Sequence, residues 1–112
     1  MLSHGIEGYI YAIQARALRV IKIGYASNPA NRLKSLQTGS PDLLNMIGLW
    51  RGVLQDEIDL HLEFGKLRVH GEWFQETPEL LKRIQELNDM ALLKECRAQK
   101  TSIRKRLYSY TR

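Results

Sequence analysis

Two short stretches rich in β-forming residues constrain the fold of this chain more than any other feature. Residues 8–14 read G-Y-I-Y-A-I-Q and residues 18–25 read L-R-V-I-K-I-G-Y, both with alternating character. Alternation of this kind is typical of strands with two different faces, and a short polar connection is typical of an antiparallel pair. The two stretches therefore predict a β-hairpin.

The segment after this hairpin carries the signals of a short helix. Asn28 precedes Pro29, and these residues suit the N-cap and the first helical position, while Gly39 suits the end. A helix of about ten residues is therefore predicted. Residues 43–53 follow a loop and read as a third strand, although Gly48 and Asn45 are of residue types uncommon in strands.

Residues 56–67 predict a second helix with one apolar stripe. The candidates for the buried stripe are Ile58, Leu60 or Leu62, and Phe64 or Leu67. The following V-H-G-E-W-F segment predicts a turn and a short extended piece.

A third helix is predicted to begin at Thr77-Pro78, with its apolar face formed by Leu80, Ile84, Leu87 and Ala91. The predicted order is then β, β, α, β, α, α. This order indicates an α/β (α+β) domain, in which helices flank a small sheet of at least three strands. We assign residues 1–92 to this single domain and residues 93–112 to a basic C-terminal extension, which either continues the last helix or frays.

The chain has 17 Lys and Arg against 12 Asp and Glu, a net charge of +5 that favours polyanionic partners. This excess lies in the extension, whose charged residues are Lys94, Arg97, Lys100, Arg104, Lys105, Arg106 and Arg112 against Glu95 alone. A single cysteine excludes an internal disulfide, and no apolar run is long enough to span a bilayer. We expect a cytoplasmic protein that does not enter a membrane.

Six short pieces of sequence occur in an order that resembles the GIY-YIG nuclease superfamily. Tyr9-Ile10-Tyr11 and Lys22-Ile23-Gly24 stand where the two name-giving motifs are expected. The pieces that follow are Arg32 on the first helix, an R-L-x-x-L-x-x-G-x-P segment, an E-x-x-x-H pair and G-E-W-F. The pattern is similar to a small single-domain branch in which K-I-G replaces Y-I-G, and it covers residues 8–76.

The resemblance implies hydrolysis of a phosphodiester with one Mg²⁺ or Mn²⁺ ion. Tyr11 would position or deprotonate the attacking water, which requires a neighbouring cation because an ordinary tyrosine pKa is near 10. Lys22 is the expected neighbour. Arg32 would hold the scissile phosphate, Glu57 would bind the metal, and His61 would contact phosphate or act as an acid or base.

Each of these residues also has an ordinary structural explanation. Tyr11 suits a strand, and Tyr9 shares its face and could exchange roles with it. Glu57 suits the first turn of a helix, and Asp56 is its nearest competitor as metal ligand. Glu72 either lines the site or pairs with Arg68.

Further nucleic-acid contacts are predicted for Tyr9, Tyr25, Lys34, Arg68, Arg104, Lys105 and Arg106. DNA is favoured over RNA as the substrate, and the oligomeric state stays open. Because a lysine replaces the second tyrosine, one alternative is a nucleic-acid-binding module that has lost turnover. Another is an interaction protein that uses its C-terminal helix.

Overall fold

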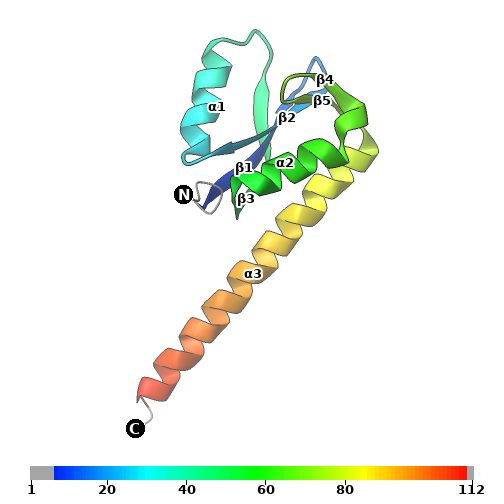
Figure 1. Cartoon of the computed structure of the whole chain (residues 1–112). Coiled ribbons are helices and arrows are strands. Elements are labelled where there is room, and N and C mark those ends of the chain that lie inside the picture. Colours follow the sequence, from blue (N-terminus) through cyan, green and yellow to red (C-terminus); the bar gives the residue numbers. More distant parts are fainter. Residues whose placement is uncertain (1–6, 111–112) are drawn as a thin grey trace, which may run out of the picture.

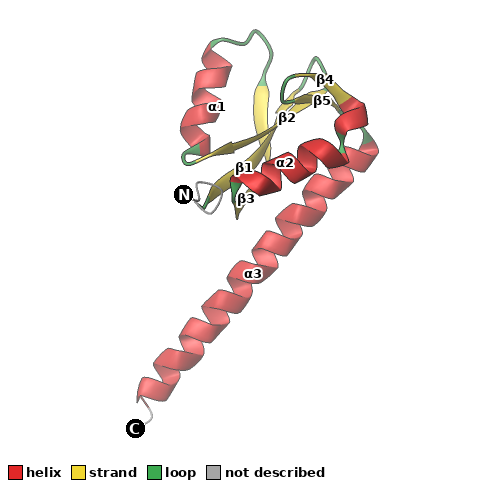
Figure 2. Cartoon of the chain, in the orientation of Figure 1, coloured by secondary structure: helices red, strands yellow, loops and turns green. Residues whose placement is uncertain are grey.

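The computed structural model describes the backbone of residues 7–110 and the side chains of residues 7–97. Figures 1 and 2 show a small sheet with helices on both faces and one long helix that runs out from it. The elements are β1 (Gly8–Ala15), β2 (Val20–Ala26), α1 (Pro29–Thr38), β3 (Leu44–Gly52), α2 (Leu54–Glu63), the 3₁₀ turn η2 (Gly65–Leu67), β4 (Arg68–His70), β5 (Trp73–Gln75) and α3 (Pro78–Tyr110).

The five strands form one sheet in the order β3-β1-β2-β5-β4, with every neighbouring pair antiparallel. This confirms the predicted fold class and adds two short strands to the predicted minimum of three. The predicted hairpin is β1 and β2, in which Tyr11 lies opposite Gly24 and Ile13 lies opposite Lys22. The Asp42 carboxylate accepts hydrogen bonds from the backbone N–H groups of the turn that joins these strands.

Alternation along the two central strands divides the interior into two clusters, one on each face of the sheet. One face is covered by α2 and α3, and its buried residues are Ile10, Ala12, Ile21, Ile23, Leu60, Phe64, Phe74, Leu80 and Ile84. The other face packs against Leu33 and Leu36 of α1, and its buried residues are Tyr11, Ile13, Ala15, Ala26 and Leu44. Tyr11 and Lys22 therefore belong to strand positions that face α1.

The helix α1 begins as the sequence predicts. The Asn28 side chain accepts a hydrogen bond from the Asn31 N–H group at 3.1 Å, and Pro29 occupies the first turn. The helix ends at Thr38, directly before Gly39. Local capping chemistry thus explains both ends of this helix.

The helix α2 differs from its prediction in both its bounds and its buried face. It ends at Glu63 instead of residue 67, and the chain continues as the turn η2. Its inward residues are Glu57, Leu60 and Phe64, whereas Ile58 and Leu62 are 42% and 76% exposed. The prediction of Ile58 in the stripe was wrong because the helix turns a carboxylate toward the protein in place of an apolar side chain.

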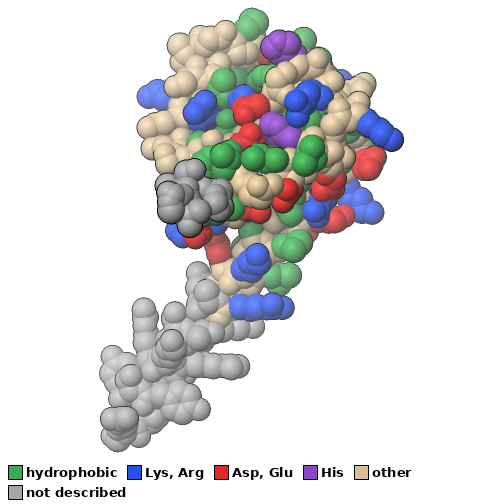
Figure 3. Space-filling view, in the orientation of Figure 1, with side chains coloured by type: hydrophobic (Ala, Val, Ile, Leu, Met, Phe, Trp, Pro, Cys, Tyr) green, Lys and Arg blue, Asp and Glu red, His purple; other side chains and the backbone are tan. Residues whose placement is uncertain are grey.

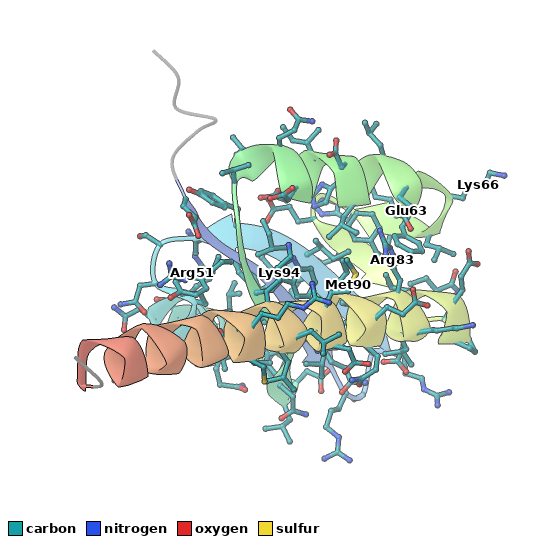
Figure 4. The ribbon with its side chains drawn as sticks, turned by 90° about the horizontal axis from the view of Figure 1, so that it is seen from below. Arg51, Glu63, Lys66, Arg83, Met90 and Lys94 are labelled. Atoms are coloured by element: carbon teal, nitrogen blue, oxygen red, sulfur yellow. The ribbon has the colours of Figure 1, made fainter. Side chains whose placement is uncertain are left out.

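The helix α3 begins at Pro78 as predicted and buries Leu80 and Ile84, while Leu87 and Ala91 are half-buried. It is tied to α2 by an ion pair in which Arg83 Nε lies 3.1 Å from Glu63 Oε2 (Figure 4). It continues without a break across residue 92, so the described backbone of the basic extension, as far as Tyr110, is part of the same helix. Within the described residues, no helix is long and apolar enough to cross a membrane.

Asn88 of α3 protects the outer edge of β3. Its side-chain amide donates to the Ile47 carbonyl at 3.0 Å and accepts from the Leu49 N–H group at 3.1 Å. Two backbone groups that an edge strand would otherwise leave unpaired are thereby bonded. Close packing supports this contact, because a Cβ atom at Gly48 would lie 2.8 Å from Ile84 of the same helix.

Replacing Asn88 by Leu should therefore destabilise the domain by roughly 1–3 kcal/mol, because both hydrogen bonds are lost at once. We also expect more self-association, since the edge of β3 becomes open to pairing. Urea unfolding and light scattering would measure the two effects, with the exposed neighbour Asp89→Leu as the control. An Asn88→Leu variant as stable as wild type would contradict this role.

Candidate active site

The side chains with catalytic chemistry meet where the pairing of β2 with β5 ends. The paired residues run only as far as Lys22 opposite Trp73, and the Ile23 N–H group then donates to the Glu72 carbonyl at 3.0 Å. Beyond this point no strand of the described part of the chain pairs with this side of β2, which we call the open edge. His61 of α2 lies 2.8 Å from the Ile23 carbonyl oxygen there. Side chains from both faces of the sheet meet around this open edge.

Lys22 is held by Glu72. Its Nζ atom lies 2.7 Å from Oε1 of Glu72, and the two side chains are 12% and 41% exposed. The Lys22 ammonium group also lies 5.7 Å from the centre of the Trp73 ring, within range of a cation–π contact. Glu72 thus pairs with Lys22 and not with Arg68, the partner that the sequence suggested.

The carboxyl groups of Glu57 and Glu72 are close enough to hydrogen-bond to each other. Burial first, and then the neighbouring Glu72, raise the pKa of Glu57 to about 7. Burial acts in the same direction on Glu72, but hydrogen bonds from Lys22 and Glu57 hold the pKa of Glu72 below its usual value. At a pH below this value, the pair therefore holds its proton on Glu57 in preference to Glu72.

Glu57 rather than Asp56 is the residue of α2 that points into this cluster. The Asp56 carboxylate accepts a hydrogen bond from the Val53 N–H group at 2.8 Å and so stabilises the start of the helix. The next residue on a helix points about 100° away, which turns Glu57 inward. The sequence suggested Glu57 as a favourable charge in the first turn and Asp56 as its competitor for the metal, and in the structure Asp56 bonds to the backbone at the helix start.

His61 lies on the same face of α2, with Nε2 3.6 Å from Glu57 Oε1. A carbonyl oxygen only accepts hydrogen bonds, so the contact with Ile23 requires a hydrogen on Nε2. Arg68 Nη2 approaches Nδ1 at 3.5 Å, and the imidazole edge packs on Phe74 at 5.0 Å between ring centres. This places His61 as a donor fixed beside Glu57, since binding a metal through Nε2 would break its bond to the backbone.

The donor set fits a divalent cation. One ligand atom each from Glu57, His61 and Glu72 lies within 4.8 Å of the others. Figure 3 shows acidic side chains and a histidine side chain adjoining on this face, with lysine and arginine side chains around them. Mg²⁺ and Mn²⁺ prefer carboxylate oxygens, and a buried carboxyl group with a raised pKa gains from a nearby positive charge.

Tyr11 reaches the same region from β1. It is 1% exposed, and its ring covers Gly24, where a Cβ atom would overlap with Cζ and Oη of the tyrosine. Burial raises the pKa of Tyr11, and the charge of Arg32 opposes this rise, whereas Glu72 and Glu57 add to it. The charge found to favour ionisation of the phenol is thus Arg32, while the predicted partner, Lys22, is paired with Glu72.

Arg32 lies on the exposed side of α1 and lines a cavity of about 480 Å³. The other lining residues are Ala26, Ser27, Asn28, Asn31, Ser35 and Leu36. Among the residues that the structure describes, none forms a hydrogen bond or ion pair with the Arg32 guanidinium. The group is therefore available for an anion beside Tyr11.

The residues predicted to contact nucleic acid are spread over the molecule. Tyr25 packs on the core beneath α2 and α3, on the other face of the sheet from Tyr11. Tyr9 lies 5.8 Å from the Arg51 guanidinium and lines a groove along α3, so the structure gives no support to an exchange of roles with Tyr11. Lys34 is exposed on α1, and Arg68 borders the cluster through His61. The side chains of Arg104, Lys105 and Arg106 lie outside the described part of the chain.

Sequence reasoning missed three features of this site. The Ile23 carbonyl that fixes His61 is a backbone group and has no signal in the sequence. The small polar residues that line the cavity beside Arg32 resemble any solvated helix surface. The sequence suggested that Glu72 lines the site or pairs with Arg68, and it did not indicate the pairing with Lys22 that the structure shows.

These elements define a small α+β domain whose open sheet edge holds two carboxylates, an imidazole and an ammonium group beside a tyrosine and an arginine. A comparison with protein-family models gives a match to the T5orf172 domain over residues 8–89. The chain belongs to the T5orf172 domain family, which is associated with DNA-binding and endonuclease-like proteins. No curated protein and no solved structure matches the chain significantly.

Proposed function

We propose that this protein is a metal-dependent endonuclease of the GIY-YIG type that hydrolyses phosphodiester bonds in DNA. The observation that carries the proposal is the meeting of Glu57, His61 and Glu72 next to Tyr11 and Arg32, although these residues come from three different elements and the turn before β5. The family match supports a role with nucleic acid. The single cysteine favours the cytoplasm as the place of action.

The cation would be Mg²⁺ or Mn²⁺, bound by Glu57, and when bound it supplies positive charge to the phosphoryl and leaving oxygens. Binding requires Glu57 to give up its proton. His61, hydrogen-bonded to the Ile23 carbonyl, keeps its Nε2–H group directed toward this part of the site and limits the movement of Glu57. The imidazole thus acts as an anchor for the metal-binding carboxylate.

Tyr11 and Arg32 would act on the substrate itself. The Arg32 guanidinium would bind the scissile phosphate through paired hydrogen bonds and balance the charge that develops on it. The phenol of Tyr11 is protonated in the described site because burial raises its pKa. With a cation bound at Glu57, the phenolate of Tyr11 would form more easily, and the phenolic proton would be released to solvent. The phenolate would then orient the attacking water and accept its proton.

Cleavage of supercoiled plasmid and of branched DNA by the purified protein, with Mg²⁺ or Mn²⁺, tests this function. Arg32→Ala should lower cleavage by a factor of 100 or more, because one donor to the developing charge is worth about that much. Arg51→Ala removes the same charge from an exposed side chain outside the site and serves as the control. Full activity of Arg32→Ala would remove this residue from the mechanism.

A nucleic-acid-binding module without turnover is the second candidate. The ion pair that occupies Lys22 favours it, because a neutralised lysine cannot assist at phosphate. This candidate predicts DNA binding that weakens steeply with salt and no cleavage with any divalent cation. Metal-dependent turnover that is lost in Glu57→Gln would reject it.

A further inference from the structure

We propose that Glu72 is a second ligand for the divalent cation and that Glu72 leaves Lys22 to take up this role, which frees the Lys22 ammonium for the substrate phosphate. This inference rests on the proposed nuclease function. In this proposal Glu72 pairs with Lys22 in the absence of the cation and binds the cation when it is present. The cation-free site would then be a resting state in which the lysine is neutralised.

The starting point is that Lys22 cannot assist catalysis in the arrangement described. Its Nζ atom is 2.7 Å from a Glu72 oxygen and its side chain is 12% exposed, so a phosphate that approached the ammonium group would also meet the carboxylate. Two anions facing each other in a partly buried site repel strongly. If Lys22 contacts phosphate at all, Glu72 has to turn away.

The Glu72 side chain has a second place to go. Its carboxylate and that of Glu57 belong to the donor group whose atoms lie within 4.8 Å of one another. Two oxygens on opposite sides of one Mg²⁺ ion are about 4 Å apart, so a small rotation of one side chain brings both within binding distance. No movement of the backbone is needed, because the Glu72 carbonyl is held by the Ile23 N–H group at 3.0 Å.

The two carboxylates differ in their freedom to move. The Glu57 side chain is 10% exposed and lies beside the anchored His61, whereas the Glu72 side chain is 41% exposed. Glu72 is thus the partner that rotates. A divalent cation also offers it twice the charge of the ammonium group, which favours the exchange.

Lys22 has a place to remain after the exchange. Its ammonium group lies 5.7 Å from the centre of the Trp73 ring, a contact that does not depend on Glu72. A cation–π contact keeps the freed group near the sheet edge. The positive charge of Lys22 is then available to the substrate phosphate, because the Glu72 carboxylate no longer pairs with it.

Calorimetric titration with Mn²⁺ alone tests the exchange without any measurement of activity. We expect Glu72→Gln to bind Mn²⁺ about 10- to 100-fold more weakly than wild type, because one of two carboxylate ligands is lost. Lys22→Met should bind it several-fold more tightly, because the competitor for Glu72 is gone. In the double variant Lys22→Met/Glu72→Gln, the gain should disappear, because Lys22 acts through Glu72.

The control variant is Glu76→Gln. Glu76 is close to Glu72 in the sequence, but its carboxylate accepts a hydrogen bond from Gln14 and lies outside the cluster. This variant should bind Mn²⁺ as wild type does. An unchanged affinity of Glu72→Gln for Mn²⁺ would overturn the proposed exchange. So would a gain in Mn²⁺ affinity from Lys22→Met that is equally large in the wild-type and Glu72→Gln backgrounds. If wild type binds no Mn²⁺, or if Glu57→Gln binds it normally, the metal-dependent function itself fails and the inference with it.

Discussion

Replacing Glu57 by Gln is expected to abolish cleavage and, in the absence of metal, to make the protein more stable at pH 8. Loss of the metal ligand should lower the rate of cleavage by a factor of 1,000 or more. The gain in stability follows from the buried carboxyl group, whose pKa is raised from 4.5 to about 7 by burial and by Glu72. A glutamine keeps the shape and carries no charge at any pH.

The sign of the pH dependence follows from the two pKa values of Glu57. Below pH 4.5 the Glu57 carboxyl group is protonated in both the folded and the unfolded protein. The folded protein binds this proton more tightly, and the resulting contribution to the free energy of unfolding is fully present there. As the pH rises to 7 this contribution is lost, because the unfolded chain ionises first. At pH 8 the Glu57→Gln variant should exceed wild type by roughly 1–3 kcal/mol in free energy of unfolding.

Thermal unfolding at pH 5 and pH 8, with and without Mn²⁺, would measure this effect. The difference between Glu57→Gln and wild type should be small at pH 5, large at pH 8 without metal, and reduced or reversed at pH 8 with metal, which binds wild type better. Glu63→Gln changes the same chemical group farther along α2, where its side chain is 43% exposed, and serves as the control. A Glu57→Gln variant that loses stability equally at both pH values would show that the carboxylate has a structural role.

Replacing Gly24 by Ala is expected to disrupt both the fold and the site. The added methyl group would overlap with Cζ and Oη of Tyr11, which is 1% exposed and packed in the core under α1. Overpacking of this kind costs roughly 1–3 kcal/mol, because the ring or the strand has to shift. The same shift would move the phenol away from Arg32 and lower cleavage more than the loss of stability alone explains.

The control for this prediction is Gly39→Ala at the end of α1. A Cβ atom there meets nothing within 4 Å, so the change adds the same methyl group without a clash. Urea unfolding would compare the stabilities, and plasmid cleavage at a temperature where both variants are folded would compare the activities. Equal behaviour of the two variants would contradict the packing of Tyr11 on Gly24.

The reason for a glycine at this position differs from the one that the motif suggests. The sequence places Gly24 between Lys22 and Arg32, and close approach of a phosphate would be a natural explanation. The structure shows that the glycine first makes room for the ring of Tyr11 on the neighbouring strand. A glycine within a motif that suggests catalysis can therefore be required for packing between the two motifs.

The sequence alone predicts the parts of this protein that depend on local chemistry. Alternation predicts the hairpin, and the Asn28-Pro29 and Thr77-Pro78 pairs predict where two helices begin, because capping and proline geometry act within a few residues. The end of α2 and the place of Ile58 in its buried face were predicted wrongly, whereas Leu60 and Phe64, both among the predicted stripe residues, are buried. An apolar stripe gives no sign that a helix turns Glu57 inward. The spacing of the motif residues predicts a common site but not its internal pairing.

Only the tertiary structure decides how the charges are paired. Lys22 and Glu72 are far apart in the sequence, and their contact depends on where β5 stops pairing with β2. The orientation of the His61 imidazole depends on the Ile23 carbonyl, a backbone group of β2. Charge pairing and burial are set by long-range packing, and the place where β5 stops pairing with β2 therefore determines how the side chains of the candidate site contact one another.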